Sequence, residues 1–114
     1  MLLDQGVTAI LTALNTSMTN GEAGGADILF DASQTGVLLP IGSTDIALNT
    51  KTLSQFTINV SYLLSTSLGN TSIGEYEIND GSSNAYNRVI RPPITKTVND
   101  ELTIAHTFDF EVPQ

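Results

Sequence analysis

One histidine, His106, is available for chemistry in this chain. Any Ser-His-Asp triad or imidazole metal site would therefore have to use it. His106 alternates with Ile104 and Phe108, so the spacing places it on the apolar face of a strand. A histidine on such a face is more often a hydrogen-bonded core or interface residue than a catalyst, because catalysis needs several converging groups. We expect His106 to be structural.

Two pairs of carboxylates lie two residues apart in alternating segments, namely Glu75 with Glu77 and Asp109 with Glu111. Paired carboxylates can act as general acid and base or hold a hard cation such as calcium. Alternating acids also keep the solvent face of a strand soluble and discourage edge pairing. No calcium-type ligand loop accompanies either pair, so we expect acids that face solvent. The sequence predicts no catalytic, cofactor-binding or metal-binding residue, and we expect the protein not to be an enzyme.

The composition narrows the class of partner. The chain has 114 residues, and 12 acidic against 4 basic residues give a net charge of −8. The basic residues form no run that could follow a phosphate backbone, which argues against nucleic-acid binding. Cysteine is absent from the sequence, so neither a disulfide framework nor a thiolate metal site can form. The length fits a single compact domain.

The N-terminal sequence, MLLDQGVTAILTALNTSM, predicts an amphipathic helix over residues 2–18, within an N-terminal helical segment 1–19. Its apolar residues recur at helical spacing and define one stripe, which consists of Leu3, Val7, Ile10, Leu11, Leu14 and Met18. Asp4 suits the first turn of a helix, where a negative charge favours the helix dipole. The stretch carries an acid where a signal peptide has basic residues, and it is too short to span a bilayer, so we expect no membrane association.

Residues 20–36 form a glycine-rich segment with one short apolar run, Ile28 to Phe30. This composition predicts a loop with at most a brief edge strand. Long loops in small domains are usually functional or disordered. Two readings stay open, an arm that reaches another subunit and a mobile surface loop.

Residues 37–114 alternate short apolar strands with turn sequences. Alternation is clearest in SQFTINVSYLL and in ELTIAHTFDFEV, while GVLLPIGSTDIAL, IGEYEI and AYNRVIR predict shorter strands. The proline pair in RPPITKT cannot donate to a strand ladder, so this segment should be an edge or a crossover between sheets. We predict a mainly β fold, an antiparallel, jelly-roll-like β-sandwich with an N-terminal amphipathic helix.

The order of segments from Ile41 to Val112 resembles a family of small bacteriophage virion proteins of the tail-fibre or head-decoration type. PPITKT followed by the alternating ELTIAHTFDF is the most specific part of the resemblance. The chain departs from the family at NTKTLSQ, where such proteins often carry a stretch rich in glycine and threonine. The resemblance implies a β-sandwich with a structural role in the virion, located in a particle assembled in the host cytoplasm, and it implies no catalytic residues.

Within that class we expect a capsid cement or decoration protein, because a tail fibre needs length to reach a host surface. Its partners would be the major capsid protein, or tail proteins in the alternative of a tail-fibre or baseplate attachment module. Clamping a shell favours a homo-oligomer, a trimer or a dimer. The candidate interface residues lie on the helix and in the loop and are Leu3, Val7, Ile10, Leu14, Asp27, Ile28 and Phe30.

An alternative from another class is a small carbohydrate-binding β-sandwich. Such a module needs exposed aromatic side chains on one sheet face. The three tyrosines, Tyr62, Tyr76 and Tyr86, are the residues that could supply them. Tyr62 alternates with core positions, which argues against this alternative.

Overall fold

The computed structural model describes residues 3–25, 29, 31, 33–42, 44–82 and 84–110. Within these ranges the chain forms one helix followed by seven strands. Their bounds, in chain order, are α1 Asp4–Ser17, β1 Asn20–Gly24, β2 Ile46–Ala47, β3 Thr50–Ser54, β4 Thr57–Leu64, β5 Ser72–Asn79, β6 Val89–Thr95 and β7 Leu102–Asp109. The prediction of a mainly β fold with an N-terminal helix is confirmed.

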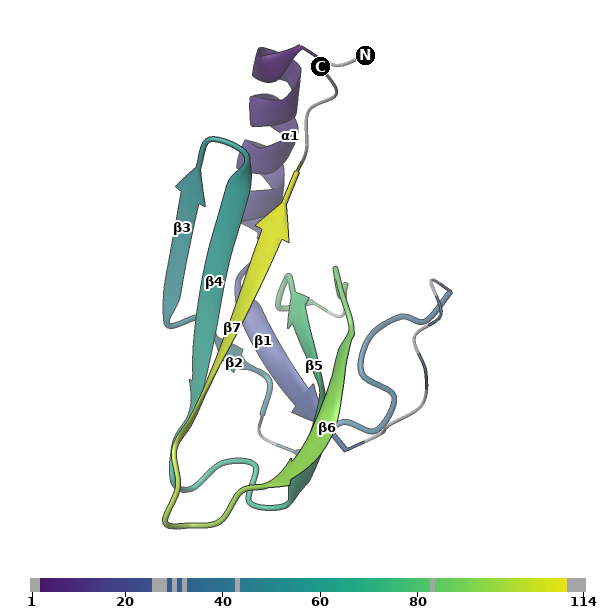
Figure 1. The fold of residues 1–114 in the computed structure, drawn as a ribbon, viewed down its shortest axis with the longest axis vertical. Helices are drawn as coiled ribbons and strands as arrows, with labels where there is room; N and C mark the ends of the chain where they lie inside the picture. Colours follow the sequence, from purple (N-terminus) through teal and green to yellow (C-terminus); the bar gives the residue numbers. More distant parts are fainter. Residues whose placement is uncertain are drawn as a thin grey trace.

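The described strands form two antiparallel sheets (Figure 1). One has the strand order β2-β1-β5-β6 and the other has the order β3-β4-β7. The sheets meet where β6 is connected to β7 and diverge toward the end that carries α1. The molecule is elongated, with extents of 47 × 27 × 25 Å, because the first turns of α1 extend beyond the hairpin of β3 and β4.

The β4 strand supplies the centre of the core, as its alternating sequence predicts. Its inward side chains Ile58, Val60, Tyr62 and Leu64 are all buried. β4 pairs with β3 on one side and with β7 on the other, so both of its edges are hydrogen-bonded. The face of α1 that is turned away from solvent packs onto this sheet through the buried side chains of Val7 and Leu11.

The β1 strand corrects the prediction of a loop over residues 20–36. Its five residues, Asn20–Gly24, form an interior strand between β2 and β5. The glycines there serve close packing instead of flexibility, since a Cβ on Gly21 would lie 2.2 Å from the Tyr62 ring. The Tyr62 hydroxyl donates to the carbonyl of Glu22 at 3.1 Å, which fixes the ring across β1. Of the brief strand expected at Ile28–Phe30, the structure describes Leu29, which is 84% exposed and belongs to no strand, whereas Ile28 and Phe30 lie outside the described residues.

The proline pair has the position that the sequence predicts. Pro92 and Pro93 lie in β6, an edge strand of its sheet, and the chain then crosses to β7 in the other sheet. The ladder of β5 and β6 is irregular between Ile73 and Glu75, opposite the prolines, which cannot donate to it. The strand expected in AYNRVIR begins later, at Val89.

The β3 strand was missed by sequence reasoning. Its residues, Thr50–Ser54, are mostly exposed and lie at the edge of the sheet. An exposed edge strand does not need apolar alternation, and TKTLS has none. Gln55, with φ +34°, makes the tight turn into β4.

Glycine at position 21 should be essential for stability. We expect Gly21→Ala to lower the free energy of unfolding by about 3 kcal/mol, because the new methyl group would displace the buried Tyr62 ring. Gly42→Ala is the matched control, since a Cβ on Gly42 meets nothing within 4 Å. Urea denaturation of the two variants tests this, and equal losses in both would contradict the packing role of Gly21.

Candidate interaction surfaces and buried polar groups

The helix α1 and Leu3, the residue that precedes it, expose apolar side chains to solvent, while other apolar side chains of α1 face the core. Leu3 is 68% exposed and Ile10 is 49% exposed, whereas Val7 is buried. Leu14 is half-buried and packs against the core. Of the predicted interface residues, Leu3 and Ile10 are thus accessible, Val7 is a core residue, and Leu14 is partly buried against the core. The other three, Asp27, Ile28 and Phe30, lie outside the described residues.

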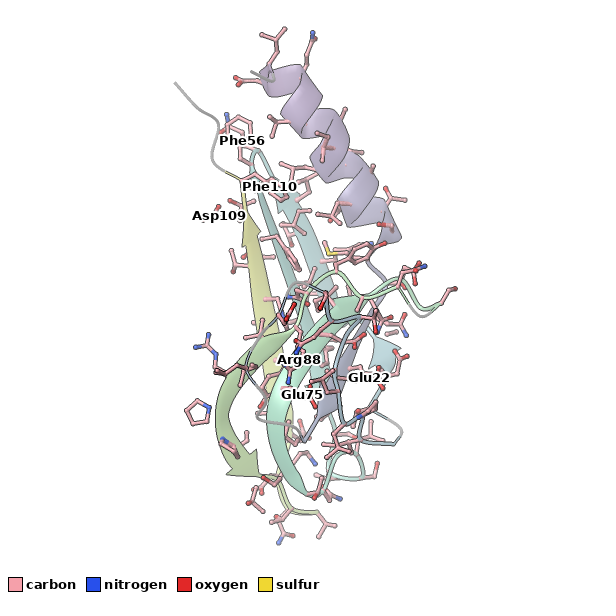
Figure 2. All side chains as sticks on the ribbon, turned by 90° about the vertical axis from the view of Figure 1, so that its right-hand side faces the viewer. Glu22, Phe56, Glu75, Arg88, Asp109 and Phe110 are labelled. Atoms are coloured by element: carbon pink, nitrogen blue, oxygen red, sulfur yellow. The ribbon has the colours of Figure 1, made fainter. Side chains whose placement is uncertain are left out.

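A third accessible apolar side chain lies at the same end of the molecule. Phe110, which is 37% exposed, follows β7, and its backbone N–H donates to the carbonyl of Phe56 at 2.9 Å. Figure 2 shows Phe56 and Phe110 at the end of the sheets beside α1. Leu3, Ile10 and Phe110 are called the helix-end surface below. Sequence reasoning missed Phe110 because it assigned this residue to the core face of the last strand.

A second accessible apolar pair lies on the segment that precedes β2. Leu39 is 61% exposed and Leu38 is 39% exposed. Their backbone N–H groups donate to the two carboxylate oxygens of Glu75, at 2.7 Å from Leu38 and 2.9 Å from Leu39. The segment is therefore held against the sheet while its leucine side chains remain outside.

Glu75 is itself fully buried, which corrects the prediction that Glu75 and Glu77 face solvent. Its carboxylate forms a salt bridge at 2.8 Å with Nε of Arg88, which is also buried. The pair lies in the half of the molecule away from Phe110 (Figure 2). A buried carboxylate that accepts two backbone N–H bonds and pairs with a guanidinium has its charge matched. The role of Glu75 in this structure is to anchor a segment.

Glu77 holds the adjoining part of the same segment. It is 5% exposed, accepts a hydrogen bond from the backbone N–H of Val37 at 2.9 Å and accepts one from Asn79 at 2.9 Å. The acids are buried because β5 is an interior strand covered on one side by the core and on the other by residues that precede β2. Glycines make the room, since a Cβ on Gly24 would lie 2.5 Å from a Glu75 oxygen and one on Gly36 would lie 2.6 Å from a Glu77 oxygen.

The second carboxylate pair differs from the first. Asp109 is exposed and accepts a hydrogen bond from the Thr57 hydroxyl at 2.6 Å, as expected for an acid on the solvent face of a strand. Glu111 lies outside the described residues. Within the described ranges, no group of three or more His, Cys, Asp or Glu side chains is arranged to hold a metal ion.

His106 is buried, as the alternation predicts, and has a hydrogen-bonded place in the core. Its ring stacks on Tyr62 with a centroid distance of 5.8 Å, and its Nδ1 lies 2.9 Å from Nδ2 of Asn87. Burial, with a smaller effect from the charge of Arg91, lowers the pKa of His106 to about 4. The imidazole is therefore neutral at pH 7.

The tyrosines form no stacking platform on one sheet face. Tyr62 is fully buried and Tyr76 is 7% exposed, while Tyr86 is 38% exposed. Carbohydrate recognition through this trio therefore has no geometric support. Among the described residues, no helix combines the length and the apolar character that crossing a bilayer requires.

Comparison of the chain with protein-family models, with curated proteins and with solved structures finds no match.

Removing one partner of the buried salt bridge between Glu75 and Arg88 should strongly reduce stability. We expect Glu75→Gln to lower the free energy of unfolding by about 3–5 kcal/mol, because it removes the negative charge that forms the salt bridge with the buried Arg88 guanidinium. It should also make the peptide bonds around Leu38 and Leu39 accessible to limited proteolysis. Glu101→Gln, at an exposed position, is the control. Wild-type stability of Glu75→Gln would contradict the anchoring role.

Glu22 should make stability fall as the pH rises. Burial, together with the negative charges of Glu77 and Asp45, raises the pKa of Glu22 from 4.5 to about 7. Between pH 4.5 and about 7, the carboxyl group of Glu22 keeps its proton in the folded state and loses it in the unfolded state. The free energy of unfolding therefore decreases as the pH rises across this range, and the stabilising effect of the proton is lost as the pH rises through 7. Glu22→Gln should gain stability relative to the wild type between about pH 5 and pH 8.

Urea midpoints of both proteins at the two pH values measure this difference. The titration of His106 has the opposite sign, because its pKa is lowered from 6.5 to about 4, but it is common to both proteins and cancels. A stability difference between the proteins that stays constant with pH would contradict the raised pKa of Glu22.

Proposed function

We propose that the protein is a structural component of a bacteriophage virion, and that it acts as a capsid cement or decoration protein. The observation that carries this proposal is the helix-end surface, which exposes Leu3, Ile10 and Phe110 at the end where α1 extends beyond the sheets. The resemblance from Ile41 to Val112 to small virion proteins supports the class. Tail attachment is the alternative to capsid decoration, and both roles would use the helix-end surface.

The exposed residues of α1 favour a partner that buries them. Leu3 and Ile10 are seven positions apart, so they lie on the same side of the helix, about two turns from each other. Fully burying a leucine or isoleucine side chain contributes roughly 1.5–3 kcal/mol. Such a contact is weak in a monomer, but it becomes strong when several copies in a symmetric oligomer bind a repetitive shell together. A trimer or dimer is proposed for this reason.

Removing the whole N-terminal segment would be a poor test of this surface. Val7, Leu11 and Met18 belong to the core, so a truncation would damage the sandwich as well as the contact. Substitutions confined to the exposed side of α1 separate the two effects.

The double variant Leu3→Gln with Ile10→Gln should fold normally and lose attachment. We expect its unfolding free energy to stay within about 0.5 kcal/mol of the wild type for each substitution, because both positions are exposed. Its affinity for shells that lack the protein should fall by more than about tenfold. Ala9→Gln with Ala13→Gln, at exposed positions of the same helix, is the matched control.

Co-sedimentation of each purified variant with shells measures attachment. Binding of the double variant at wild-type strength would contradict docking through the helix-end surface. Quantitative mass spectrometry of purified virions then tests the place on the particle. A copy number comparable to the major shell protein is expected, a far smaller one would assign the protein to the tail, and its absence would contradict a virion role.

A further inference from the structure

A groove separates the two sheets on the side where they are not closed. It lies between β6 and β7, has a volume of about 470 Å³ and is lined by Tyr76, Val89, Arg91, Ile104 and His106 among others. Figure 1 shows the two strands diverging from their shared connection, so that neither pairs with the other. Both walls of the groove are edge strands.

The edge of β7 that borders the groove carries a row of open backbone groups. Phe110 donates its N–H to Phe56, so the even-numbered residues of β7 bond to β4 and the odd-numbered residues point away from it. The N–H and C=O groups of Thr103, Ala105 and Thr107 therefore face the open side. In the described part of the chain, no strand pairs with them. An unpaired edge of this kind is a template for an additional strand.

The facing edge of β6 is not such a template. Pro92 and Pro93 interrupt it, and neither has an N–H to donate. A strand added to this part of the molecule would therefore pair with β7. Its side chains would alternate between solvent, beside the exposed Ala105, and the groove, beside Ile104 and His106.

One of the residues that line the groove, His106, has a buried donor that lacks an acceptor among the described residues. The backbone N–H of Ile78 donates to Oδ1 of Asn87 at 2.7 Å, so Nδ2 of Asn87 is the atom that faces His106. Because Nδ2 can only donate, Nδ1 of His106 is the acceptor and the proton of the neutral ring is on Nε2. His106 is 7% exposed, and its Nε2 has no partner among the described residues. A buried donor without an acceptor is costly and rare.

The positive charge of Arg91 also favours an acidic ligand in the groove. Arg91 is the charged residue among those that line the groove, in a chain whose net charge is −8. Arg91 is exposed and close enough to His106 to influence its titration. A guanidinium and an imidazole N–H are both donors, and a carboxylate can accept from both.

We propose that the free edge of β7 binds an extended segment of a partner protein as an added strand, and that an acidic side chain of this segment enters the groove between Arg91 and Nε2 of His106. The site is separate from the helix-end surface, and it does not depend on a virion role. A second copy of this chain is a poorer occupant. Two β7 strands paired antiparallel about Ala105 would place Glu101 opposite Asp109 of the other copy, twice.

The direct test is titration with blocked peptides as long as β7, which has 8 residues. Threonine alternates with valine in each peptide, and one central valine is replaced by glutamate or, in the control, by glutamine. The glutamate peptide should slow hydrogen exchange at the amides of Thr103, Ala105 and Thr107 and shift the Nε2 proton of His106. We expect it to bind about tenfold more tightly than the glutamine peptide, and Arg91→Gln should abolish that difference.

Two variants test the strand pairing separately from the charge. Ala105→Pro removes an N–H that faces away from β4 and should abolish peptide binding, whereas Ala105→Thr keeps this N–H and should bind as the wild type does. The native pairing of β7 with β4, seen in the amide exchange of His106, shows whether each variant is folded. Failure of the glutamate peptide to protect the three amides would overturn the proposal. Equal affinity for both peptides would overturn the acidic specificity, and protection that rises with protein concentration alone would assign the edge to a second copy.

Discussion

The buried carboxylate of Glu75 is the interaction on which much of the architecture depends. It joins β5, the segment at Leu38 and Leu39 and the side chain of Arg88, which are distant in sequence. A buried carboxylate is tolerated only when several hydrogen-bond donors surround it. The close approach of β1 at Gly24 and the path of the chain before β2 are therefore fixed by this carboxylate as much as by apolar packing.

A second constraint comes from the way in which the two sheets meet. Their contact is tight around Tyr62, which stacks on His106 of its own sheet and packs on Gly21 of the other. Away from this contact the sheets diverge, and the prolines of β6 prevent the chain from closing the gap by its own pairing. The same geometry that gives an apolar core beneath β4 leaves an open strand edge at β7.

Buried polar groups stabilise the fold, whereas exposed apolar side chains are available for contacts with a partner. Acids at β5 are buried and paired, and they hold exposed leucines in fixed positions instead of solvating a sheet. The helix divides its apolar side chains between a core face at Val7 and Leu11 and an outer face at Leu3 and Ile10. A small acidic domain thus keeps one compact core and offers apolar contacts at its periphery, where a partner can cover them.

The sequence alone determined the elements whose signal is local. The period of two in β4 and β7, the helical stripe of α1 and the proline edge of β6 each follow from neighbouring residues, and His106 was placed on an apolar face in the same way. Only the tertiary structure decided the interior position of β1, the burial of Glu75 and the accessibility of Leu3 and Ile10. These depend on which distant segment covers a residue. From the sequence, Gly21 is expected to be flexible and Glu75 to be exposed. In the structure, the Tyr62 ring packs against Gly21, and the donors of Leu38, Leu39 and Arg88 surround the carboxylate of Glu75.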